Sequence, residues 1–316
     1  MITQILLLAL GLVLLITGAN GLVDGASALA KKFNVSDLAI GLTIVAFGTS
    51  APELVVNVFA SYQGHQDIVF GNVIGSNNFN LFIILGITGL ITPIVVQSST
   101  IWKEIPISFL GIVLVYLLTH HFLGSDSNTL TRVDGFLLLL LFGLFLYYVY
   151  KQLKSDPVEI EVKVNNYSNL KIWCYVIFGL AGLVIGGRLL VTTAVDLATT
   201  FGMSEKLIGL TIVAAGTSLP ELATSVVAAL KKNSDIAVGN IIGSNIFNLF
   251  FILATSAVIK PIDYDTVFDL DMYILAGGTL LVFIAMFTGK KKKLDRWEAA
   301  ILLVGYLGYM AYIIQK

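Results

Sequence analysis

Two stretches of this chain are almost the same: IGLTIVAFGTSAPEL (residues 40–54) returns as IGLTIVAAGTSLPEL (208–222). A second pair, GNVIGSNNFNLF (71–82) and GNIIGSNIFNLF (239–250), keeps the same shift of 168 positions. In the best-matching window of the first pair, nine of ten residues are identical. A single register held over more than 50 residues indicates that the chain contains a duplicated unit.

The duplicated unit lies in a very apolar chain. Of the 316 residues, 57% are hydrophobic and 12% are charged, and the mean hydropathy is +0.89. Soluble domains carry about 25% charged residues, so this composition indicates a membrane protein. The net charge of −1 argues against a nucleic-acid partner. The single cysteine, Cys174, excludes an internal disulfide.

Ten segments are apolar and long enough to be transmembrane helices, which need about 20 residues. The predicted spans cover about residues 4–30, 37–61, 67–94, 105–121, 133–150, 171–199, 205–230, 235–258, 270–288 and 296–314. Several exceed one membrane thickness and contain Gly, Pro, Ser and Asn together, which predicts tilted or broken helices. The N-terminal run lacks the basic region of a signal peptide, so we expect it to be a retained first span.

Each copy of the repeat contains five predicted spans. Because five is odd, the second copy enters the membrane from the opposite face, which predicts inverted-topology repeats. We therefore expect an all-α polytopic membrane protein with ten transmembrane helices. Residues 1–150 are the first five-helix repeat, 151–170 are a short linker, and 171–316 are the second, inverted repeat.

Glu53 and Glu221 are equivalent acids in the middle of spans 2 and 7. A carboxylate at the bilayer centre costs roughly 2.5–3.5 kcal/mol on insertion scales. The middles of spans 2, 3, 7 and 8 contain no basic residue that could neutralise these acids. The compensating charge must therefore be mobile, either a proton or a bound cation. Two acids without a fixed counter-charge suit a divalent cation.

Neutral oxygen atoms accompany both acids. Thr49 lies four residues before Glu53, so both side chains face one side of a helix, and Ser76 and Asn80 are related in the same way. The second copy repeats both pairs as Thr217 with Glu221 and Ser244 with Asn248. Calcium takes about six to eight oxygen ligands in flexible geometry, so this set favours calcium.

The backbone near the first acid is expected to supply further ligands. Pro52 has no amide hydrogen and Gly48 permits an unusual backbone, so we expect freed carbonyl oxygens in residues 46–49. A transition metal would want His or Cys ligands. The three histidines lie in or beside loops, at His65, His120 and His121.

Two other patterns predict structure rather than ion binding. The Gly71–Gly75 and Gly239–Gly243 pairs are expected to be close-packing faces between helices. The acidic run DYDTVFDLD at 263–271 lacks the central glycine and final glutamate of an EF-hand, so we expect a solvated outer loop.

The paired GTSxPEL and GNxIGSNxFN segments resemble the alpha repeats of the cation/calcium antiporter superfamily, and within it the prokaryotic sodium/calcium exchangers. The strong match covers about residues 36–94 and 204–262. The resemblance implies ion sites between spans 2, 3, 7 and 8, with Glu53 and Glu221 as carboxylates shared by calcium and sodium. The other ligands that it implies are Thr49, Ser50, Thr217, Ser218, Ser76, Ser244, Asn80, Asn248, Ala46 and Ala214, the last two through their carbonyls.

This resemblance implies a secondary active antiporter, not an enzyme, that exchanges sodium for calcium by alternating access and needs no cofactor. One calcium ion balances two ionised glutamates, whereas three sodium ions leave one positive charge, so the expected exchange is electrogenic. Asn248 stands where potassium-dependent exchangers have an aspartate, which argues against a potassium requirement. A proton/calcium antiporter and, from another class, a passive cation channel remain as alternatives. The expected partners are the two ions and the lipid bilayer, with no obligate protein partner.

The basic residues predict the orientation. Of 19 Lys and Arg residues, fourteen fall in the odd-numbered loops and their flanks and four on the other side. Basic residues are enriched in cytoplasmic loops. We therefore expect loop 151–170 in the cytoplasm and both termini outside the cell, in a multi-pass protein of the plasma membrane.

Overall fold

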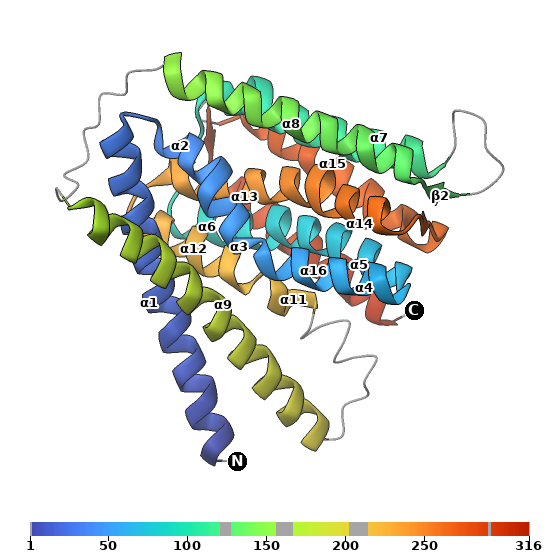
Figure 1. Cartoon of the computed structure of the whole chain (residues 1–316), viewed down its shortest axis with the longest axis horizontal. Coiled ribbons are helices and arrows are strands. Elements are labelled where there is room, and N and C mark those ends of the chain that lie inside the picture. Colours follow the sequence, from blue (N-terminus) through green and yellow to red (C-terminus); the bar gives the residue numbers. More distant parts are fainter. Residues whose placement is uncertain (1, 121–127, 156–166, 202–213, 290–291, 316) are drawn as a thin grey trace.

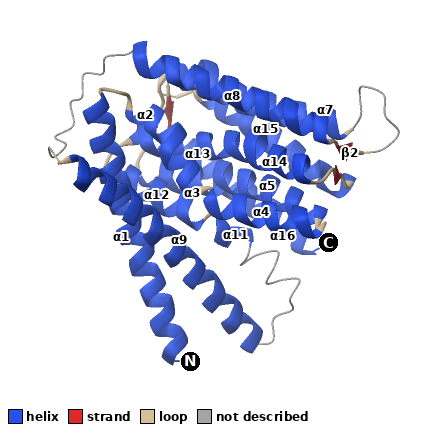
Figure 2. Cartoon of the chain, viewed as in Figure 1, coloured by secondary structure: helices blue, strands red, loops and turns tan. Residues whose placement is uncertain are grey.

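The structure is a computed structural model that describes residues 2–120, 128–155, 167–201, 214–289 and 292–315. Helices make up almost all of it, with four strands of two residues each (Figure 2). The first part comprises α1 (Ile2–Phe33), α2 (Asp37–Ile40), η1 (Gly41–Val45), α3 (Ala46–Thr49), α4 (Ala51–Gln63), α5 (Gln66–Asn78), η2 (Phe79–Ile84), α6 (Leu85–Ile91), β1 (Ile94–Val95), η3 (Thr100–Glu104), α7 (Ile105–Thr119), β2 (Thr129–Leu130) and α8 (Arg132–Ser155).

The second part begins with the long helix α9 and ends near the C-terminus. It comprises α9 (Asn169–Thr200), α11 (Ala214–Thr217), α12 (Leu219–Leu230), α13 (Ser234–Phe247), η5 (Asn248–Ile252), α14 (Leu253–Ile259), β3 (Ile262–Asp263), η6 (Thr266–Phe268), α15 (Asp269–Ala285), β4 (Lys293–Leu294) and α16 (Arg296–Gln315).

The polytopic helical class predicted from the sequence is confirmed. Among the described residues, seven helices are long and apolar enough to cross a membrane, or eight if the bent pair Asp37–Thr49 and Ala51–Gln63 is one span. Described helices occupy all ten predicted places, but α12 has only 12 residues. The start of the predicted span 205–230, and most of linker 151–170, lie outside the described residues.

The predicted break within GTSxPEL is present in both copies. The helix before Ser50 and the helix after it meet at 48°. Ser50 separates α3 from α4 with φ −82 and ψ 7, and Ser218 separates α11 from α12 with φ −89 and ψ 8. A proline follows two residues later, at Pro52 and Pro220, where its fixed φ and missing donor suit the first turn of a new helix.

The third and eighth spans form the centre of the bundle. In the most apolar stretch of the span Ser234–Ile259, 94% of the residues are buried, compared with 28% in that of the first span, Thr3–Phe33. Figure 1 shows α13 and α14 in the middle of the molecule, with α7 and α8 along one edge and α1 and α9 crossing at the other. Polar side chains of the central spans are therefore screened from lipid.

Glycines allow the central helix to approach span 2 closely. A Cβ on Gly239 would lie 2.8 Å from the Leu38 carbonyl oxygen, and one on Gly243 would lie 2.8 Å from the Ala46 Cβ. This pair is the predicted close-packing face. The equivalent Gly75 has no described atom within 4 Å of such a Cβ, so the first copy does not show the same contact. Residues 202–213, which are equivalent to the segment that Gly239 and Gly243 contact, lie outside the described residues.

Contacts at the ends of the spans occur in equivalent pairs. Strand β1 pairs antiparallel with β4, and β3, which is 168 positions after β1, pairs antiparallel with β2. Likewise the Arg296 guanidinium donates to the Leu90 and Ile91 carbonyls at the end of α6. Arg132 makes the same two bonds at the end of α14, to the carbonyls of Val258 and Ile259. The duplication is therefore visible in the tertiary contacts.

Helices α1 and α9 pack antiparallel along a line of glycines. A Cβ on Gly18 would lie 2.8 Å from the Gly179 carbonyl oxygen, and one on Gly186 would lie 2.7 Å from the Leu15 amide nitrogen. Such backbone-to-backbone contact needs small residues. Much of the outward face of these helices is exposed, as expected for a pair of helices in contact with lipid.

Candidate functional site

Glu53 and Glu221 each lie in the first turn of the helix that follows the break, in α4 and α12 respectively. Both are buried, with 1% of each residue exposed. The positive end of the helix dipole stabilises a carboxylate in this position, although by only about 0.3–2 kcal/mol. The break therefore places each acid where the backbone offsets part of its burial cost.

A serine of each copy binds the glutamate of the other copy. Ser50 Oγ donates to Glu221 Oε1 over 2.8 Å, and Ser218 Oγ donates to Glu53 Oε1 over 3.2 Å. Ser50 Oγ also lies 3.0 Å from Ser244 Oγ, which brings the eighth span to the same place. The residues of two distant segments thus converge on one polar centre.

The second oxygen of each carboxylate is the most unusual feature of this centre. Glu53 Oε2 and Glu221 Oε2 are buried and have no hydrogen-bond partner among the described residues. No ion pair among the described residues involves either acid. A buried ionised carboxylate is costly unless it is paired or coordinates a metal ion. Each of these oxygens can therefore take up a mobile positive charge, either a proton or a bound cation.

The two threonines next to the serines bind asparagines of the opposite copy. Thr49 Oγ1 donates to Asn240 Oδ1 over 3.0 Å, and Thr217 Oγ1 donates to Asn72 Oδ1 over 3.3 Å. Asn240 Nδ2 also donates to the Glu221 carbonyl. Each threonine hydroxyl therefore links its own copy to an asparagine of the other, and Thr49 Oγ1 also lies 3.3 Å from the Ala46 carbonyl oxygen.

The four remaining side-chain ligands that the resemblance implies lie on the central helices and are nearly or fully buried: Ser76, Asn80, Ser244 and Asn248. Ser76 Oγ has no hydrogen-bond partner among the described residues. Asn80 lies in η2 and Asn248 begins η5, two segments wound as π-helix. Such wide turns often occur at functional sites.

The carbonyl of Ala46, one of the two expected carbonyl ligands, takes part in helix bonding. The Ala46 carbonyl accepts the Ser50 amide over 3.0 Å and lies 3.3 Å from Thr49 Oγ1, so it is not freed from helix bonding as the sequence predicts. The reason is that α3 stays helical to Thr49 and the chain bends only at Ser50. Ala214 is the first residue described after 202–213 and begins α11.

The sequence analysis missed the asparagines that support the site: Asn72, Asn77, Asn240 and Asn245. Each has its equivalent 168 positions away, and that equivalence was the signal that could have found them. It also missed Asn57, one helical turn after Glu53, which is fully buried. Neither atom of the Asn57 side-chain amide has a partner among the described residues.

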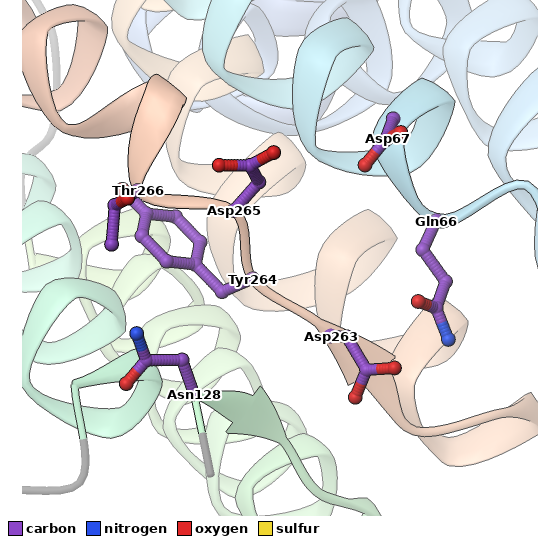
Figure 3. A pocket seen from close by; sticks show the side chains of 7 residues that line it. All are labelled: Gln66, Asp67, Asn128, Asp263, Tyr264, Asp265 and Thr266. Atoms are coloured by element: carbon purple, nitrogen blue, oxygen red, sulfur yellow. The ribbon is translucent and has the colours of Figure 1, made fainter.

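A separate open cavity of about 420 Å³ lies away from the glutamates, at the predicted acidic loop (Figure 3). Its lining residues are Gln66, Asp67, Asn128, Asp263, Tyr264, Asp265 and Thr266. The three carboxylates are exposed and give the cavity a negative potential that attracts cations. Burial, together with a hydrogen bond to Asp269, raises the pKa of the Tyr264 hydroxyl above its ordinary value, so it stays a donor.

Comparison with known proteins finds a matching protein family and several relatives that align over nearly the whole chain. The profile of the family described as "Sodium/calcium exchanger protein" matches residues 3–151 and 171–315. Putative antiporter CaxA of Alkalimonas amylolytica is 42% identical, and the alignment covers 98% of both proteins. Sodium/calcium exchanger MaX1 of Methanosarcina acetivorans is 30% identical over 98% of this chain and 97% of its own length. The solved structure of the sodium–calcium exchanger NCX_Mj matches with a TM-score of 0.85, 32% identity and 99% of each chain covered.

Proposed function

The chain belongs to the sodium/calcium exchanger protein family, whose members are transporters rather than enzymes, and we propose that it exchanges sodium for calcium across the membrane. The observation that carries this proposal is the pair of buried glutamates, Glu53 and Glu221. Each is held by a serine of the other copy and each keeps one oxygen without a described partner. The two acids provide the charge that calcium needs and leave room for neutral oxygen ligands.

The proposed ligand set is the one that the motifs suggest. Glu53 and Glu221 supply the charge and are shared by calcium and sodium. The neutral ligands of this proposal are Thr49, Ser50, Ser76, Asn80, Thr217, Ser218, Ser244, Asn248 and the carbonyls of Ala46 and Ala214. The Ala46 carbonyl would bind through the lone pair that its helical hydrogen bond leaves free. The burial and convergence of the described side chains support it.

The number of carboxylates sets the proposed stoichiometry. One calcium ion neutralises two ionised glutamates, whereas three sodium ions leave one net positive charge. Since both ions need the same carboxylates, full occupancy by one excludes the other. Exchange of three sodium ions for one calcium ion would then move one charge in each cycle.

Asn248 supports exchange without potassium. It is buried in the central span and carries a neutral amide at the position where potassium-dependent exchangers have an aspartate. Without that acid the site has no further negative charge to hold an additional monovalent cation beside calcium. We propose that potassium is neither required nor transported.

Alternating access is the proposed transport mechanism. Inverted repeats with broken helices that meet near the membrane centre are typical of carriers. Helices α1 and α9 contact each other through backbone atoms at Gly18 and Gly179, and buried leucine and valine side chains of both helices pack around this contact. We propose that this pair moves as a unit across the four central spans and opens the site to either side in turn.

The proposed arrangement places the protein in the plasma membrane with both termini outside and residues 151–170 in the cytoplasm. The two segments matched by the family profile, 3–151 and 171–315, leave this linker out and support repeats at 1–150 and 171–316. The basic residues of the odd-numbered loops are the reason for the orientation.

Calcium uptake into proteoliposomes tests the proposed function. Vesicles loaded with sodium should accumulate radioactive calcium when diluted into sodium-free medium, and outward potassium or proton gradients should not replace the sodium gradient. Uptake driven by the proton gradient would instead indicate a proton/calcium antiporter. Calcium flux that neither saturates nor shows counter-flow would indicate a passive channel.

A further inference from the structure

Four buried asparagines form a hydrogen-bonded set between the two copies. We call Asn77, Asn80, Asn245 and Asn248 the asparagine bridge; none is more than 1% exposed. Asn77 and Asn80 belong to the third span, and Asn245 and Asn248 to the eighth. Four hydrogen bonds within the bridge each join one copy to the other.

Backbone groups fix the orientation of two of these amides. Asn77 Nδ2 donates to the Asn245 carbonyl over 3.3 Å, and Asn245 Nδ2 donates to the Asn77 carbonyl over 3.4 Å. A backbone carbonyl can only accept, so the nitrogen of each amide must face it. The oxygen of each side chain, Oδ1, is thereby fixed on the opposite side.

These two oxygens in turn fix the other two amides. Asn80 Nδ2 donates to Asn245 Oδ1 over 3.1 Å, and Asn248 Nδ2 donates to Asn77 Oδ1 over 2.8 Å. Each of these Oδ1 atoms can only accept a hydrogen bond, so the Nδ2 group of Asn80 or Asn248 must face it. Turning either side-chain amide by 180° would place two oxygens against each other and break the bond. Their own Oδ1 atoms point away and, although buried, have no partner among the described residues.

The helix geometry relates these free oxygens to the glutamates. Asn80 and Asn248 each follow a site serine by four residues, Ser76 and Ser244, and so lie on the same helix face. Ser244 lies against Ser50, which binds Glu221. An amide oxygen attracts a cation, whereas an amide NH₂ repels it, so the orientation of these amides decides whether they are ligands.

We infer that Asn77 and Asn245 are positioning residues, which hold the amides of Asn248 and Asn80 so that their oxygens face the transported cation. Each ion-facing amide is thus held by the copy that does not contain it. The inference rests on the proposed function, because it concerns the ligands of that site. It predicts a pattern of coupling that a merely structural role would not produce.

Double-mutant cycles on sodium-driven calcium uptake test this pattern. Loss of one supporting hydrogen bond in N245L should raise the KM for calcium about tenfold and change the maximal rate less. Adding this change to N80L should cause no further loss, because Asn245 acts through Asn80. The matched cycle of N245L with N248L should show nearly multiplicative losses. The equivalent pair in the other copy, N77L with N248L, should behave like N245L with N80L, so that the double variant has no higher KM than N248L alone.

The inference would be overturned if the increases in KM multiply in both the Asn80–Asn245 and the Asn77–Asn248 cycles, because the two residues of each pair would then act independently. If the wild-type protein shows no sodium-driven uptake, the proposed function fails. The same cycles are then run on equilibrium binding of calcium to the purified protein, where the couplings still decide the inference.

Nuclear magnetic resonance of the wild-type protein decides the matter if the variants do not fold. With labelled asparagine, calcium should shift the side-chain carbonyl carbons of Asn80 and Asn248. Their NH₂ hydrogens should stay protected from exchange, since Asn245 and Asn77 accept them. Unshifted carbonyl carbons, or NH₂ groups that exchange freely, would contradict the inference.

Discussion

The Ser50 hydroxyl donates to the Glu221 carboxylate over 2.8 Å, although 171 positions separate the two residues in the chain. Ser218 and Glu53 make the reciprocal bond over 3.2 Å. Each acid is therefore completed by the other copy of the repeat. Neither half of the chain contains the whole of the proposed site, so its predicted ion affinity depends on how the two halves pack together.

Replacing Ser50 with alanine should weaken calcium binding by about ten- to a hundredfold, because a hydrogen bond to a charged group contributes about 1.5–3 kcal/mol. The measurement is equilibrium binding of radioactive calcium to purified protein. S256A is the matched control: Ser256 is buried, and among the described residues its hydroxyl donates only to the Ile252 carbonyl, one turn earlier in the same span. Equal affinities of S50A and S256A would contradict the prediction.

Replacing either glutamate by glutamine should stabilise the ion-free protein and abolish its response to calcium. A buried polar group without a partner costs about 1–3 kcal/mol, and more when it is charged, so removing the charge should raise Tm. The calcium-induced rise in Tm should fall to nothing in both E53Q and E221Q. A variant that melts earlier than the wild type and keeps its calcium response would show that the carboxylate is structural.

The close approach of α13 to span 2 makes a strong prediction for Gly239. A Cβ there would lie 2.8 Å from the Leu38 carbonyl oxygen and 2.9 Å from the Leu42 amide nitrogen. Backbone atoms cannot move aside as a flexible side chain can, so G239A should lower stability by about 1–3 kcal/mol. Gly308, in α16, has no described atom within 4 Å of such a Cβ, and G308A should leave Tm unchanged or slightly higher. Equal melting of the two variants would refute the contact.

Cross-linking α1 to the core should stop transport if α1 moves during exchange. The Lys231 ammonium lies 2.7 Å from the Asp24 carboxylate and joins α12 to α1. In a C174S background, D24C with K231C can be joined by a short thiol-reactive linker that reducing agent cleaves. Sodium-driven calcium uptake should cease on linking and return on reduction, and each single-cysteine variant serves as a control. Full uptake by the linked protein would exclude movement of α1 relative to α12.

Much of the fold follows from the duplication in the sequence. The two GTSxPEL segments predicted a helix break beside a buried acid in each copy, and Ser50 and Ser218 are the break points. The acids converge because equivalent positions of the repeats meet at the centre of the bundle. The reciprocal bonds of Arg132 and Arg296 could not be predicted, since they depend on where distant helix ends meet in space.

The finer features of the site could not be predicted from the sequence, because they also depend on contacts in three dimensions. The carbonyl of Ala46 was expected to be free, but the bend falls at Ser50, so a normal helical bond forms. The orientation of the Asn77 and Asn245 amides depends on backbone groups in the opposite copy, and residue spacing within one segment carries no information about them. Spacing indicates which residues share a helix face; contacts between the copies decide which atoms are available.

Competition between the two ions for one site is the most direct test of the central claim that Glu53 and Glu221 form a single shared cation site. Binding of radioactive calcium to the purified protein should saturate at one ion per chain. Added sodium should raise the apparent Kd for calcium without lowering this capacity, and the dependence on sodium concentration should be steeper than first order. Calcium binding that is indifferent to sodium, or that saturates at two ions per chain, would contradict the account.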